Sequence, residues 1–152
     1  GMNMADEYLN YIILLENTLA SFYENIKEQE KYEGLKTLLE FMETHSFAHA
    51  LQVEEYIKDK KKPELSQSVI LDYQNNLTKK VIREISKKTD MKHILDELAA
   101  SEEKLGDLYK KIAKHMLDLS EYYKDMAGVV ENIAADEYQH RDILLRDKDK
   151  VK

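Results

Sequence analysis

The sequence predicts an all-α protein built as a bundle of four helices. Its 152 residues include one proline and four glycines, whereas helix-forming Leu, Glu, Lys, Ala and Met are abundant. Four long segments also carry apolar residues at alternating steps of four and three, the pattern of a helix with one buried face. A chain of this length buries a sizeable core without disulfide staples, so we expect a single domain over residues 1–152.

The predicted helices cover residues 4–29, 35–60, 91–116 and 121–146. A break near Gly34 separates the first two, and Thr89 or Asp90 is placed to cap the third. Ser120 is placed to cap the fourth. The short connections within each pair of helices predict two antiparallel hairpins.

Each predicted helix has one row of residues that faces the core. In chain order the rows are Ala5, Leu9, Ile12, Glu16, Leu19, Tyr23 and Ile26; Leu35, Leu39, Met42, Ser46, His49, Val53 and Tyr56; Leu95, Leu98, Glu102, Leu105, Tyr109, Ile112 and Met116; and Tyr123, Met126, Val130, Ile133, Glu137, His140 and Leu144. No lysine or arginine occurs in these rows. Each row instead contains a glutamate or a histidine near its middle.

The two hairpins match each other in sequence. Glu16 in the first helix and Glu102 in the third each stand seven residues before a tyrosine. The segment Ser-Phe-Ala-His at 46–49 aligns with Glu-Tyr-Gln-His at 137–140. We therefore interpret the chain as a duplicated helix hairpin whose copies differ mainly in loop length.

The segment between the hairpins, residues 61–90, is long enough to run the length of the bundle as a crossover. Such a crossover makes the second and third helices parallel. Its aliphatic residues need burial, and Asn76 is placed to cap a short amphipathic helix over residues 77–87.

Composition excludes several kinds of function. The chain has 30 acidic and 23 basic residues, a net charge of −7, with the signs interleaved, which argues against nucleic acid as a partner. The absence of cysteine excludes thiolate metal sites and cysteine nucleophiles. No apolar run approaches the roughly 20 residues of a membrane span. We expect a cytoplasmic protein with no membrane partner.

Five polar residues occupy core positions near the helix centres, where charged groups are rare unless paired: Glu16, His49, Glu102, Glu137 and His140. Two helices that each supply a Glu and two that each supply a Glu-x-x-His pair bind two metal ions in helix bundles. Mixed carboxylate and imidazole ligands suit iron or manganese, and zinc also fits. The alternative is structural, with the glutamates bonded to tyrosines and the histidines satisfied within the core.

The same motifs carry a family resemblance: Glu16 with Tyr23, Glu102 with Tyr109, His49 before Ala50, and the Glu-Tyr-Gln-His segment at 137–140. With them the chain resembles the rubrerythrin-like branch of the ferritin-like superfamily, over all four core helices but not residues 61–90. The resemblance implies a ferritin-like bundle and two metal ions, most simply iron. Its implied ligands are Glu16, His49, Glu102, Glu137 and His140, with Tyr23, Tyr109 and Ser46 beside them.

Ser46 departs from the family pattern, which has a bridging glutamate at this position. Three outcomes are open. The site holds two metals with water or an exogenous anion beside Ser46, it holds one metal only, or His45 or Glu43 on the same helix substitutes as a ligand.

The resemblance implies a non-haem dinuclear iron or manganese protein that reacts bound metal with dioxygen or hydrogen peroxide. Without cysteine there is no rubredoxin-type iron centre, so turnover would need an external electron donor or would stop at metal oxidation. The alternatives are a degenerate ferritin-like domain that binds metal or a protein partner without turnover, and a bundle with no metal. Whether the protein is an enzyme stays open, and a homodimer is expected.

Overall fold

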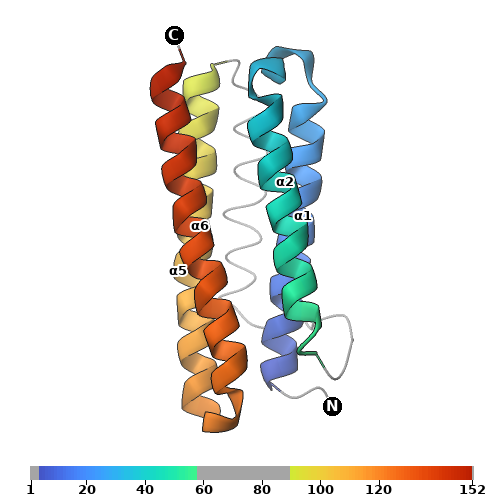
Figure 1. The fold of residues 1–152 in the computed structure, drawn as a ribbon, viewed down its shortest axis with the longest axis vertical. Coiled ribbons are helices and arrows are strands. Elements are labelled where there is room, and N and C mark those ends of the chain that lie inside the picture. The colour runs from blue at the N-terminus through green and yellow to red at the C-terminus, as the bar shows by residue number, and fades with distance from the viewer. Residues whose placement is uncertain (1–3, 58–89, 152) are drawn as a thin grey trace. The chain divides into compact units, whose positions relative to one another are not determined.

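The computed structural model describes residues 4–57 and 90–151, and these residues are helical with no strand among them. The all-α prediction is therefore confirmed for this part of the chain. The chain divides into two compact units, residues 1–72 and 73–152, and the described part of each is one helical hairpin (Figure 1). The predicted crossover over 61–90, with its short helix over 77–87, lies outside the described residues apart from Asp90.

The first hairpin consists of α1 (Met4–Lys27), the 3-10 helix η1 (Glu30–Leu35) and α2 (Lys36–Glu54). Figure 1 shows α1 and α2 side by side and antiparallel, with η1 in the turn between them. The break expected near Gly34 is thus a short helix of tighter pitch. Inside it Tyr32 leaves the helical conformation (φ −111°, ψ 16°) and its side chain is fully buried, which anchors the turn in the core.

The second hairpin consists of α5 (Met91–Leu119), the 3-10 helix η3 (Glu121–Tyr123) and α6 (Lys124–Lys150). Both residues predicted as caps accept a backbone hydrogen bond. The Asp90 carboxylate accepts a hydrogen bond from the backbone N–H of Lys92 at 3.0 Å, and the Ser120 hydroxyl accepts one from Tyr122 at 3.1 Å. Ser120 therefore caps η3, the turn that leads into α6, rather than α6 itself. None of the described helices has the length and apolar character needed to cross a bilayer.

The predicted core rows are buried throughout α1 and α5, but two predictions fail at helix ends. Tyr56 is only half-buried, because α2 ends at Glu54 and the helical period stops there. In the fourth row Tyr123 and Met126 are also only half-buried, whereas Ala127 is buried. For Tyr123 the reason is the 3-10 turn that it ends, which winds more tightly than an α-helix. Met126 lies inside α6, where the neighbouring Ala127 is the residue that faces the core.

The buried part of α1 is wider than one row. Besides the predicted residues it buries a second set: Asp6, Tyr8, Asn10, Tyr11, Leu15, Ala20 and Phe22. In α5 the comparable set comprises Ile94, Ala99, Ser101, Gly106, Leu108 and Ala113. The first and third helices are therefore the most enclosed elements among those described, which a single-row reading of the sequence does not reveal.

Gly106 lets α5 pass close to Tyr138 of α6. A Cβ added at Gly106 would lie 2.9 Å from Cε1 of the Tyr138 ring, whereas one added at Gly128 would meet nothing within 4 Å. The two glycines therefore form a matched pair, both inside helices but only one under steric constraint.

We predict opposite effects of alanine at these two glycines. Gly128→Ala should raise the free energy of unfolding by about 0.5–1 kcal/mol, because alanine restricts the unfolded chain and favours helix. Gly106→Ala should lower it by about 1–3 kcal/mol, because the ring must move from a packed position. Urea denaturation followed by circular dichroism measures both. Equal stabilisation by the two substitutions would contradict the close packing of Tyr138.

Candidate metal centre

Three predicted ligands of the second hairpin converge in its core. Glu102 of α5 is 1% exposed, and Glu137 and His140 of α6 are 1% and 4% exposed. His140 Nδ1 lies 3.9 Å from Glu102 Oε2 and 3.7 Å from Glu137 Oε1. One ligand atom from each residue lies within 4.8 Å of the others. The three-residue spacing places Glu137 and His140 on one face of α6, and antiparallel packing brings Glu102 to meet them.

The first hairpin brings together the corresponding two residues. Glu16 of α1 is 0% exposed and His49 of α2 is 2% exposed. His49 Nδ1 lies 3.3 Å from Glu16 Oε1. Each hairpin therefore places an imidazole of its second long helix against a carboxylate of its first.

Ser46 is the point at which the two hairpins differ. It is 4% exposed and stands three residues before His49, as Glu137 stands before His140. A serine hydroxyl is neutral and shorter than a glutamate side chain, so it does not supply the negative oxygen that a hard metal ion prefers. The first hairpin thus offers two strong donors where the second offers three.

The two proposed substitute ligands lie at the edge of the first hairpin. Glu43 forms an ion pair with Lys27 of α1 at 2.8 Å, and this hydrogen bond raises the pKa of Lys27. The His45 ring is half-buried and packs on Phe41, with ring centroids 4.1 Å apart. Its centroid is 6.4 Å from that of His49, edge to face. Within the described ranges neither residue joins a group of three ligating side chains, so their use as ligands stays a prediction.

Tyr23 and Tyr109 are fully buried, as predicted. Each follows its glutamate by seven residues, about 10 Å along the helix axis. Helical side chains lean toward the N-terminus, so each tyrosine leans toward its glutamate. Their role beside the ligands stays a prediction.

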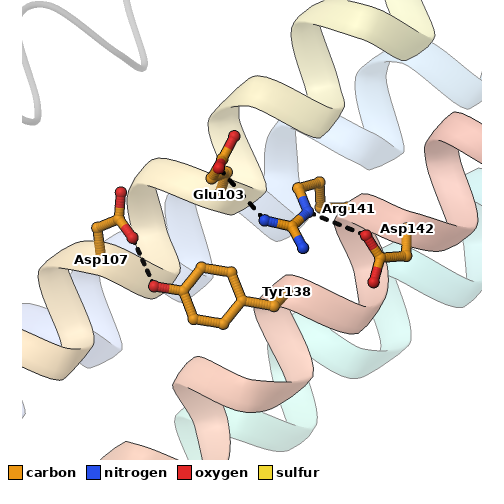
Figure 2. A network of polar contacts seen from close by, with 5 residues as sticks. All are labelled: Glu103, Asp107, Tyr138, Arg141 and Asp142. Atoms are coloured by element: carbon orange, nitrogen blue, oxygen red, sulfur yellow. Dashed lines mark hydrogen bonds and ion pairs between the residues drawn. The ribbon is translucent and has the colours of Figure 1, made fainter.

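A set of polar contacts ties α5 to α6 on the exposed side of the second hairpin, and Figure 2 shows it from close by. The Tyr138 hydroxyl donates a hydrogen bond to Asp107 Oδ1, and Arg141 Nη1 lies 3.3 Å from Glu103 Oε1. Arg141 Nε also donates to Asp142 Oδ1 at 3.0 Å. We call the two ties between the helices, Tyr138–Asp107 and Arg141–Glu103, the outer clamp.

Cations cover the Tyr138 ring. The Arg141 guanidinium carbon lies 5.2 Å and the Lys110 ammonium nitrogen 5.7 Å from its centroid, both within cation–π range. Burial, together with the hydrogen bond to Asp107, raises the pKa of Tyr138 to about 12. The phenol is therefore neutral near pH 7 and available as a donor.

The outer clamp escaped prediction from the sequence. Three of its four members directly follow a ligand: Glu103 after Glu102, Tyr138 after Glu137 and Arg141 after His140. The available signal was Gly106, an isolated glycine inside a helical pattern, which often marks close packing.

Comparison of the chain with protein-family models, curated proteins and solved structures gives no match. The described residues establish a helical protein with buried glutamate and histidine groups that could bind metal.

The hydrogen bond of Tyr138 leads to a pH-dependent prediction. Tyr138→Phe should lower the free energy of unfolding by about 0.5–1.5 kcal/mol near neutral pH, because Asp107 loses its donor. The pKa of about 12 lies above the ordinary 10.0, so the folded state favours the neutral phenol. This contribution is complete below pH 10.0 and is lost as the pH rises toward about 12.

Urea denaturation of both proteins across this range measures the difference between them. It should be constant at lower pH and shrink above pH 10.0. Tyr122→Phe, at a side chain 68% exposed, is the control and should change little. A difference that persists undiminished near pH 12 would show that the hydrogen bond is not its source.

Proposed function

We propose that this protein is a non-haem dinuclear metal protein whose two ions, iron or manganese, react with dioxygen or hydrogen peroxide. The second half-site, Glu102, Glu137 and His140, and the first half-site, Glu16 and His49, would hold the ions. The observation that carries the proposal is the second half-site, where two carboxylates and an imidazole lie buried within 4.8 Å of one another.

The donor set fits such ions chemically. Carboxylate oxygen and imidazole nitrogen suit ferrous, manganous and zinc ions. Two carboxylates beside one imidazole carry excess negative charge, and buried charge is costly unless it is compensated. A divalent cation supplies that compensation, and the core rows contain no lysine or arginine that would do so.

The first half-site supports a second ion. The His49–Glu16 contact at 3.3 Å repeats the His140–Glu102 contact at 3.9 Å in the other hairpin. The resemblance to rubrerythrin-like proteins leads to the same assignment, with one histidine for each metal, Glu16 and Glu102 as terminal ligands and Glu137 as the bridge. The ferritin-like arrangement and the duplication of the hairpin are part of this proposal.

A bound iron or manganese pair would supply the electrons that reduce the oxidant. The chain would hold the ligands in place and keep bulk water away from them, since all five are at most 4% exposed. The sequence contains no cysteine with which to build a second, rubredoxin-type iron centre. Repeated turnover would thus draw on an external electron donor, and without one the reaction would end once the bound metal is oxidised.

Ser46 favours a second candidate function, a degenerate ferritin-like domain that binds metal or a partner without turnover. Ferrous oxidation by the natural chain and by Ser46→Glu separates the two. Oxidation by the natural chain supports the dinuclear oxidoreductase. Oxidation by Ser46→Glu alone supports the degenerate domain.

Metal content is the direct test of the dinuclear proposal. Protein purified without chelator should contain close to two transition-metal ions per chain by elemental analysis. Removing them should lower the thermal midpoint, and restoring manganous or zinc ion should raise it, because an ion that binds only the folded state stabilises it. A chain that takes up none of these ions above trace levels would refute the proposal.

Glu137→Gln should change stability in opposite directions with and without metal. Without metal it should raise the thermal midpoint, because a neutral amide removes the repulsion between two buried carboxylates. With manganous or zinc ion it should abolish most of the metal-induced rise, because a ligand is lost.

The matched control for this comparison is Glu131→Gln, at an exposed position of the same helix, which should change neither midpoint. Glu137 has a structural role in the core if Glu137→Gln lowers the midpoint of the metal-free protein and metal leaves the midpoint of the natural chain unchanged.

A further inference from the structure

The two hairpins present unequal metal half-sites. The second half-site has three strong donors in one hairpin, Glu102, Glu137 and His140. The first has Glu16 and His49, with the neutral Ser46 at the position of Glu137. The first hairpin therefore contributes one fewer carboxylate of its own than the second hairpin does.

The outer clamp adds to this inequality. Tyr138–Asp107 and Arg141–Glu103 fix α5 against α6 directly beside the three donors of the second half-site (Figure 2). Ligands that are already held in position lose less conformational freedom when they bind an ion. Groups that hydrogen-bond metal ligands typically change metal affinity by about 10–100-fold, and contacts that hold the ligand-bearing helices together act in the same direction.

The first hairpin has no residues with which to build the same clamp. Phe47 and Ala50 stand at the positions of Tyr138 and Arg141, and neither side chain has a polar atom. Ala20 stands at the position of Gly106, where the missing Cβ admits the Tyr138 ring. The chemistry that positions the second half-site is therefore confined to one copy of the hairpin.

We infer that the two half-sites load in a fixed order, with the second filling first and tightly and the first filling later and at least about 10-fold more weakly. This inference rests on the proposed metal function and adds the identity of the stronger half-site. It also assigns Tyr138 and Arg141 as positioning residues for that half-site. A form with one ion, held by Glu102, Glu137 and His140, is then the main species when metal is limiting.

Calorimetric titration of the metal-free full chain with zinc ion tests the order without redox chemistry. Two separate phases of one ion each are expected, with affinities that differ at least about 10-fold. His140→Ala should remove the tight phase, and His49→Ala should remove only the weak one. Ser46→Glu should strengthen the weak phase. His93→Ala, at an exposed position of α5, is the control and should preserve both phases.

The same titration tests the positioning role of Tyr138 and Arg141 separately. Tyr138→Phe and Arg141→Gln should weaken the tight phase by about 10-fold and leave the weak phase unchanged. General destabilisation of the fold would weaken both phases, so the weak phase is an internal reference. Equal loss in the two phases would overturn the positioning role.

The remaining outcomes distinguish a failure of the loading order from a failure of the proposed metal function. No zinc uptake refutes the metal function itself. Two ions that bind in one phase with equal affinity refute the order alone. If the natural chain binds one ion, and His140→Ala abolishes this binding while His49→Ala does not, the stronger half-site is supported and the second ion is refuted. Binding that His49→Ala abolishes and His140→Ala does not overturns the inference. Glu102→Gln, which preserves side-chain shape, tests the same half-site if His140→Ala does not fold.

Discussion

The structure depends on the burial of charged groups inside helical hairpins. Glu102 and Glu137 are each 1% exposed, and a buried carboxylate costs several kcal/mol unless its charge is compensated. Domains of this kind have a net stability of about 5–15 kcal/mol, so two uncompensated carboxylates would remove much of it. The fold must therefore bring compensating groups to these positions. His140 Nδ1 lies within 4 Å of both carboxylates.

Packing around the second half-site shows how a hairpin supports such a cluster. The ligands face inward, while the residues that follow them in sequence, Tyr138 and Arg141, tie the helices together on the exposed side. Gly106 allows the approach that this tie requires. In the first hairpin, the Lys27–Glu43 ion pair joins α1 to α2 at positions that do not match those of the outer clamp. Similar core rows thus have different outer contacts, and the proposed order of metal loading depends on this difference.

The regular part of the fold was predictable because helix periodicity is a local property. Every residue in the predicted rows of α1 and α5 is buried, and both capping residues behave as expected. Two of the failures occur where the backbone leaves the α-helical period, at Tyr56 beyond the end of α2 and at Tyr123 in η3. A fixed period cannot anticipate a 3-10 turn, because that turn is selected by how the chain packs at the end of the hairpin.

The sequence by itself determined the helical class, the caps and the residues able to bind metal, because composition, spacing and donor chemistry are properties of residues. Only the tertiary structure decided that His49 meets Glu16, that His140 meets Glu102, and that Tyr138 bonds Asp107. These contacts join residues distant in sequence, and their distances depend on how two helices pack. Glu137 and Ser46 occupy matching positions in the sequence, but in the structure only Glu137 completes a group of three donors with the histidine and glutamate of its own hairpin.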